Sequence, residues 1–147
     1  MKSQYLMLAK EYYHYVDGSH IEHHPNETRW LLGSALHRVY GPAIEYSNGH
    51  KHWYLAGKLH RVGGPALKYT DGSEWWYQNG LRHRIDEPAC LYHNGDKEWY
   101  QNGLLHREDG PAIEINGGGK AWYIDGEKIY CNTNEEFLRL IKLKAFW

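Results

Sequence analysis

The sequence has few of the residues that mark several common classes of protein. Its 147 residues include two cysteines, Cys90 and Cys131, and two phenylalanines. The two cysteines replace different residue types in the repeat described below, so they do not indicate a disulfide framework and they favour a reducing compartment. No stretch approaches the roughly 18 apolar residues of a membrane span, and the first residues lack the apolar run of a signal peptide. We therefore expect a cytoplasmic protein without a membrane partner.

A basic excess is also missing from the composition. The net charge is −1 and the isoelectric point lies near 6.8. Proteins that hold nucleic acid by neutralising phosphates usually carry a clear positive excess. A nucleic-acid partner is therefore not expected.

Tyrosine, tryptophan and glycine are the abundant residues. The chain has 13 Tyr, 7 Trp and 16 Gly. Tyr and Trp pack well on a pleated strand surface, and their polar tips suit half-exposed positions. The glycines predict frequent turns. This composition favours an all-β protein.

A unit of 23 residues recurs along the chain. His-Arg opens each clear unit, and Trp-Tyr stands near the end, before a closing glycine. Gly-Pro-Ala follows His-Arg in three of these units, and Glu87-Pro88-Ala89 replaces it in unit 83–105. The His-Arg pairs are His37-Arg38, His60-Arg61, His83-Arg84 and His106-Arg107. We take residues 1–131 as one repeat domain, with a degenerate unit at 14–36 and clear units at 37–59, 60–82, 83–105 and 106–128. Residues 5–8 are interpreted as the tail of a half-unit.

Each unit is predicted to form a β-hairpin. In unit 37–59, Asn48-Gly49 is a preferred two-residue type I′ turn between two strand-like segments. This turn sets Ile44 opposite Trp53 and Ala43 opposite Tyr54. Alternation then sorts the side chains onto two faces. One predicted face carries Ile44, Tyr46, Lys51 and Trp53, and the other carries Ala43, Glu45, His52 and Tyr54.

Hairpins laid side by side turn equivalent positions into columns. A single hairpin is marginal alone, so each unit needs its neighbours. We predict one long twisted antiparallel sheet with a structural apolar column of tryptophans on one face and a column of tyrosines on the other. The tryptophan column is Trp30, Trp53, Trp76, Trp99 and Trp122. The tyrosine column is Tyr54, Tyr77, Tyr100 and Tyr123.

The last residues, 132–147, predict a helix that caps the array. Thr133 and Glu136 have the spacing of a capping box, with Thr at N-cap and Glu at N3. Phe137, Leu138 and Ile141 lie on one face of the predicted helix, which is expected to end near Ala145. A terminal repeat needs such a cover. An amphipathic helix at a membrane surface is the alternative.

The units resemble the MORN repeat. The resemblance is carried by segments such as Trp76–His83 and Tyr69–Gly72, and it covers residues 14–128. The MORN-2 variants of YwqK-type antitoxins are a looser match, and uncharacterised repeat proteins of phages and large DNA viruses share the Leu-His-Arg-x-x-Gly-Pro-Ala form. The chain departs from MORN units in having Arg after His. The resemblance implies a β-hairpin array that acts as an interaction surface, a dimerisation element or a scaffold.

The recurring histidines do not predict a metal site. Equivalent positions in neighbouring hairpins lie two strands apart, about 9–10 Å, whereas the ligands of one zinc ion lie about 3–4 Å apart. We expect each histidine to bond a connecting loop. The densest group joins His20, His23 and His24 to His50 and His52, but a strand sends His23 and His24 to opposite faces. No metal or cofactor is predicted.

The arginine column Arg38, Arg61, Arg84 and Arg107 is open to two interpretations. Guanidinium groups grip carboxylates or phosphates in a bidentate manner, so the column, with the tyrosine column, is a candidate surface for a ligand or partner. Alternatively, acidic residues in the same units pair with the arginines internally. Every polar residue that could act as a general base recurs in most units, which is typical of structural positions. The sequence also has no nucleophile elbow. No catalytic residue is predicted.

Three functions fit these patterns. The first is a non-catalytic protein–protein interaction module, because Trp, Tyr and Arg are enriched in binding hot spots. With the viral resemblance, its partner would be a host protein, such as a defence nuclease or toxin that this protein inhibits in the host cytoplasm; the exposed sheet edges also allow a homodimer. The second is a binder of nucleotides or glycans, and the third is a purely structural scaffold.

Overall fold

The structure is a computed structural model that describes residues 19–144. The predicted half-unit at residues 5–8, the start of unit 14–36 and residues 145–147 of the predicted cap lie outside the described residues. The described part contains the strands β1 to β18 and the helix α2.

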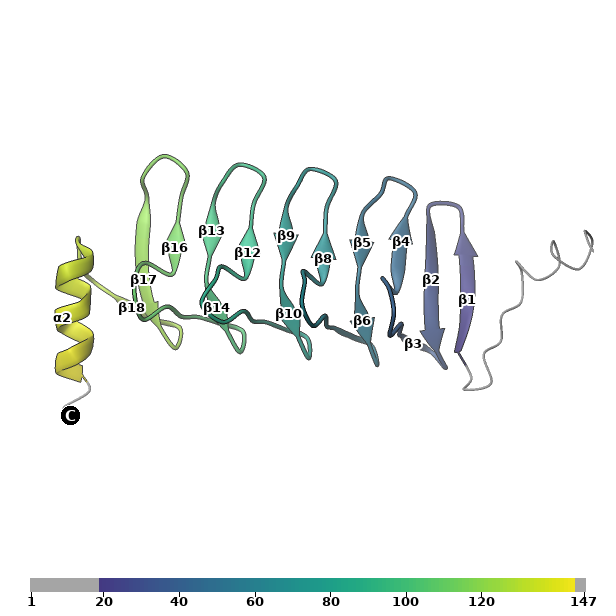
Figure 1. Cartoon of the computed structure of the whole chain (residues 1–147), viewed down its shortest axis with the longest axis horizontal. Coiled ribbons are helices and arrows are strands. Elements are labelled where there is room, and N and C mark those ends of the chain that lie inside the picture. The colour runs from purple at the N-terminus through teal and green to yellow at the C-terminus, as the bar shows by residue number, and fades with distance from the viewer. Residues whose placement is uncertain (1–18, 145–147) are drawn as a thin grey trace, which may run out of the picture.

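Every unit contributes one main hairpin to a long antiparallel sheet (Figure 1). The main hairpins are β1 (Ser19–His24) with β2 (Glu27–Leu32), β4 (Ile44–Tyr46) with β5 (Lys51–His52), β8 (Leu67–Lys68) with β9 (Glu74–Trp75), β12 (Cys90–Leu91) with β13 (Lys97–Glu98), and β16 (Ile113–Glu114) with β17 (Lys120–Ile124). Successive hairpins pair with one another, in the order β1-β2-β4-β5-β8-β9-β12-β13-β16-β17, so the sheet is continuous. The predicted all-β array of tandem hairpins is confirmed.

A second, short hairpin follows each main hairpin and lies below it in Figure 1. The short hairpins are β2 with β3 (Ala35–Leu36), β6 (Tyr54–Leu55) with β7 (Lys58–Leu59), β10 (Tyr77–Gln78) with β11 (Leu81–Arg82), β14 (Tyr100–Gln101) with β15 (Leu104–Leu105), and β17 with β18 (Glu127–Ile129). Asn79 and Gly80 form the turn of one of them with φ values of 53° and 86°, as a type I′ turn requires. These short hairpins were not predicted from the sequence, because the glycines of their turns were interpreted as the ends of units.

The register predicted for the main hairpins is wrong by one residue in the clear units. Glu45 pairs with Lys51, and Ile44 pairs with His52 rather than with Trp53. The loop has three residues instead of two, since the N–H of Tyr46 donates to the carbonyl of His50 at 3.0 Å. Its third residue, Gly49, has φ of 92°. This is the geometry of a type I turn followed by a glycine bulge, not of a type I′ turn.

In the clear units, the slip exchanges the side chains of the returning strand between the two faces. One face carries the tryptophan column with Ala43, Glu45 and Lys51 and their equivalents; with the arginines described below it is called the Trp–Arg face. The other, called the Tyr face, carries Ile44, Tyr46, His52 and Tyr54 and their equivalents. The predicted pairing of the tryptophans with the isoleucine column is therefore wrong in the clear units, whereas in the first hairpin Ile21 pairs with Trp30 as predicted. The tryptophans nevertheless recur at one equivalent position per unit, as predicted.

The small alanines of the Gly-Pro-Ala segments lie at the centre of the sheet. Ala43, Ala66, Ala89 and Ala112 are fully buried. The carbonyl of Ala66 accepts the N–H of Trp53 at 2.7 Å, and the other alanines accept the N–H of the preceding tryptophan in the same way. These bonds join consecutive units, and the full burial of each alanine explains why a residue without a bulky side chain stands at this position.

The helix α2 (Asn134–Lys144) covers the last hairpin, as predicted. Its Phe137 is fully buried against Trp122 and Ile129. Thr133 is the N-cap, because its hydroxyl accepts the N–H of Glu136 at 3.2 Å, and the Glu136 carboxylate accepts the N–H of Asn132 at 3.0 Å. The ring of Trp122 packs against this helix, whereas the rings of Trp30, Trp53, Trp76 and Trp99 each pack against an arginine.

Candidate interaction surface

Each arginine of the column lies flat on a tryptophan of the preceding unit. The Cζ atom of Arg61 is 3.9 Å from the centre of the Trp53 ring, and the same distance is 3.9 Å for Arg38 on Trp30, 3.9 Å for Arg84 on Trp76 and 4.0 Å for Arg107 on Trp99. Such stacking is a favourable cation–π contact. The arginine column is therefore part of the fold.

The residues after each arginine hold this stack in place. Arg61 Nη1 donates to the carbonyl of Pro65 at 3.1 Å, and the other three arginines make the same bond to their prolines. A Cβ atom at Gly64 would lie 2.9 Å from Arg61 Cζ. The glycine thus gives the guanidinium room on its outer side at Arg38, Arg61 and Arg107, whereas Glu87 takes this position beside Arg84. The proline carbonyl is the acceptor in all four units. Burial of the Arg61 guanidinium against the ring lowers its pKa.

The histidine column joins successive short hairpins. His60, which follows the short hairpin β6–β7, accepts through Nδ1 the N–H of Asn79 at 3.1 Å, in the turn of the next short hairpin, β10–β11. The equivalent bonds run from Ala56 to His37, from Asn102 to His83 and from Asp125 to His106. The interpretation that each histidine bonds a loop is confirmed for these four, and the loop is the turn of the following short hairpin.

The histidines around the first two hairpins are not brought together. His23 Nδ1 lies 3.2 Å from the hydroxyl of Thr28, and His24 Nε2 lies 3.2 Å from the Glu22 carboxylate. His50 accepts the N–H of Thr70 instead. His52 packs between aromatic rings on the Tyr face, and this burial lowers its pKa. His20 and His24 both lie beside the Glu22 carboxylate, whereas the buried His52 Nε2 has no hydrogen-bond partner in the described part of the chain.

The tyrosine column includes two members that are tied into an internal network. Arg82 Nε donates to the hydroxyl of Tyr77 and its Nη1 to the hydroxyl of Tyr100, both at 3.1 Å. Burial alone would lower the pKa of Arg82, but the bond to Tyr77 and the neighbouring groups hold it above its usual value. The Tyr92 hydroxyl donates to Glu98 at 3.1 Å beside them. Sequence reasoning missed Arg82, because this residue type does not recur at the equivalent positions.

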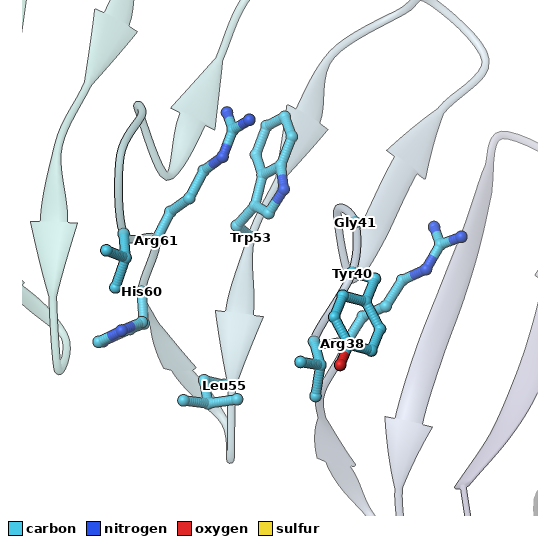
Figure 2. Close-up of a pocket in the computed structure, with 9 residues that line it drawn as sticks. Arg38, Tyr40, Gly41, Trp53, Leu55, His60 and Arg61 are labelled. Atoms are coloured by element: carbon cyan, nitrogen blue, oxygen red, sulfur yellow. The ribbon is translucent and has the colours of Figure 1, made fainter.

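The Trp–Arg face carries a row of hollows, one between each pair of successive connecting segments. The hollow in Figure 2 measures about 440 Å³ and is lined by Arg38, Val39, Tyr40, Gly41, Trp53, Leu55, His60, Arg61 and Val62. An equivalent hollow of about 470 Å³ lies one unit further, between the segments of Arg61 and Arg84. Smaller ones lie beside Trp30 and Trp99, at about 310 Å³ and 250 Å³. The 23-residue repeat therefore places similar hollows at regular intervals along this face.

Exposed apolar side chains stand between these hollows. Tyr40 is 96% exposed, Val62 82%, Ile85 64% and Val39 63%. All four belong to the short segment that follows His-Arg. These side chains were not predicted as part of a surface. The sequence feature that could have indicated them is the position directly after His-Arg, which is apolar in three of the four clear units.

Comparisons of the chain with protein-family models, with curated proteins and with solved structures found no match. The resemblance to the MORN repeat therefore stays a prediction. No helix among residues 19–144 has the length and apolar character needed to cross a membrane.

Proposed function

We propose that this protein is a non-catalytic protein–protein interaction module, whose partner binds on the Trp–Arg face along the row of hollows. The observation that carries the proposal is the exposure of Tyr40, Val62 and Ile85 on successive connecting segments of one face. Large apolar side chains gathered on an exposed face mark contact sites for other proteins. Val62 and Ile85 recur at the unit spacing, so the surface suits an extended partner.

The segments that carry these side chains are held rigidly. The arginine before Val62 is clamped between Trp53 and the carbonyl of Pro65, and its backbone N–H donates to the carbonyl of Tyr77 at 3.2 Å. A surface that is already ordered loses little conformational entropy on binding. The hollows with their exposed rims are therefore suited to recognition.

The small-ligand alternative has less support. It depends on the aromatic columns as stacking platforms, but the tryptophans are covered by arginines and the hydroxyls of Tyr77 and Tyr100 are bonded to Arg82. The resemblance to phage and viral repeat proteins extends the proposal: the partner is then a host protein, such as a defence nuclease or toxin, which this chain inhibits.

Site-specific photocrosslinking tests the proposal. A benzoylphenylalanine replaces Val62 in one full-length variant and Tyr130 in the other; Tyr130 is 83% exposed and lies near the opposite end of the array. In cells that naturally contain the protein, we expect Val62→benzoylphenylalanine to give discrete protein adducts that the Tyr130 variant lacks. The same adducts from both variants, or none from the Val62 variant, would contradict the proposal. Adducts that contain only a second copy of the chain would identify a homodimer.

A further inference from the structure

The repeats show where a carboxylate docks on a stacked guanidinium. Arg107 receives Asp109, two residues later, at 2.7 Å and Glu114, seven residues later, at 2.9 Å. Arg84 pairs with Glu87, three residues later. Arg38 has Glu45, seven residues later, at 3.6 Å. Three positions after the arginine can therefore place a carboxylate on it.

All three positions lack a carboxylate in the unit of Arg61. They hold Gly63, Gly64 and Lys68. Glu74 is the nearby acidic residue whose charge opposes the lowering of the Arg61 pKa by burial. Glu74 is itself paired with Lys68 at 3.1 Å. Within residues 19–144, Arg61 is the column arginine that has no carboxylate in salt-bridge distance.

The Arg61 guanidinium is nevertheless held as firmly as the others. It stacks on Trp53 at 3.9 Å, and Nη1 donates to Pro65 at 3.1 Å. Its Nε and Nη2 atoms donate no hydrogen bond to the described part of the chain, and Figure 2 shows the guanidinium beside Trp53, at the rim of the hollow. A planar guanidinium that is held in place and has unused N–H donors is suited to bind a carboxylate through two parallel hydrogen bonds.

The surroundings of this hollow favour an acidic and apolar ligand. Arg38 and Arg61 line it together with the exposed Val39, Tyr40 and Val62, and its lining contains no acidic residue. The equivalent hollow beside Trp99 is lined instead by three carboxylates, those of Asp86, Glu108 and Asp109. An acidic segment is therefore attracted to the first hollow and repelled from the second.

We propose that the hollow between Arg38 and Arg61 binds a short acidic–apolar segment of the partner protein. An aspartate or glutamate side chain of that segment pairs with the open Nε and Nη2 donors of Arg61, which lines this hollow. A neighbouring apolar side chain lies against Val39, Tyr40 and Leu55. This inference depends on the proposed interaction function and specifies the chemistry of the partner.

A random peptide display library, selected on the immobilised full-length chain, is the probe. We expect the selected peptides to share an Asp or Glu next to an apolar residue. Synthetic versions of these peptides, measured by fluorescence anisotropy, should bind Arg61→Gln about tenfold or more weakly, because a hydrogen-bonded charge pair is lost. Lys58→Gln removes the same charge from an exposed lysine outside the hollow and should leave the affinity nearly unchanged.

Two further variants move the carboxylate within the chain. Gly64→Glu keeps Arg61 but copies Glu87, so it should block peptide binding as strongly as Arg61→Gln does. Glu87→Gly should free Arg84 and add a second equivalent of bound peptide in isothermal titration calorimetry. Circular dichroism confirms that each variant is folded.

The outcomes separate this inference from the proposed function. Selected peptides that lack acidic residues, or that bind Gly64→Glu as tightly as the wild type, overturn the carboxylate site. If their binding is still lost in Tyr40→Ala, the interaction function stands without it. If binding survives in all of these variants, or if no peptide is selected, both proposals fail.

Discussion

The first hairpin and the clear units have the same spacing but different registers. Nine residues separate Ile21 from Trp30 and Ile44 from Trp53. In the first hairpin, Ile21 lies directly opposite Trp30, and the strands pair without interruption from Ser19 to Leu32. In the next unit, Ile44 lies opposite His52. A one-residue slip thus separates two hairpins whose sequences align without a gap.

The loop residues explain this difference. Pro25 and Asn26 form the whole loop of the first hairpin, since His24 pairs with Glu27. Asn48 and Gly49 occupy the same two positions of the next unit, but Gly49 has φ of 92°, and the loop takes a third residue. Glycine enters this region at little cost, whereas Asn26 has no positive φ. The conformation of one loop residue therefore decides which side chains share a face.

The largest effect is expected from the tryptophan column. Trp99→Ala should lower the free energy of unfolding by about 3–5 kcal/mol, because it empties a buried site and removes the ring beneath Arg107. Trp99 is 7% exposed, whereas Trp30, in the first hairpin, is only half-buried. Trp30→Ala should cost clearly less in urea unfolding followed by circular dichroism. Equal losses would show that the first hairpin is as tightly packed as the clear units.

The loop glycines should give the next largest effect. Gly72→Ala forces an alanine to φ of 94° with no atom near the new Cβ, so the cost is that of the backbone alone, about 1–2 kcal/mol. Asn26→Ala, at the equivalent position of the first hairpin, should change stability by less than about 0.5 kcal/mol. The measurement is again urea unfolding. A large loss in Asn26→Ala would contradict the explanation of the register.

The histidines should give the smallest difference. His83→Ala removes the acceptor for the N–H of Asn102 and so weakens the contact between two successive short hairpins, by about 1 kcal/mol. His23→Ala removes a bond to Thr28 within the first hairpin and should stay within about 0.5 kcal/mol. Hydrogen exchange at Asn102 provides the local readout. Unchanged exchange in His83→Ala would mean that this bond does not join the two short hairpins.

Local patterns explain what could be predicted of the fold. The period, the hairpins and the capping box at Thr133 each depend on residues that lie close together in the chain. The short hairpins also depend on neighbouring residues, and Asn79-Gly80 is a turn sequence that could have predicted one of them. The glycine was instead interpreted as the end of a repeat unit. The register of the clear units could not be predicted in this way, because Asn48-Gly49 fits both a two-residue turn and a three-residue loop with a bulge.

The candidate surface was predicted in part. The arginine column was recognised, but its two interpretations could not be separated, since pairing depends on how close side chains from different segments lie. Three of the arginines have carboxylate partners in their own units and Arg61 has none. The hollows and their exposed rims were not predicted, because neither exists in a single unit.

The sequence by itself determined that this chain is an array of β-hairpins closed by a helix, since strand alternation, turn glycines and a helix cap act over a few residues. The tertiary structure alone decided which side chains meet. The face on which each tryptophan lies depends on the backbone angle of a loop glycine, and the open guanidinium of Arg61 depends on packing against Trp53 and on carboxylates that other units supply and this one does not.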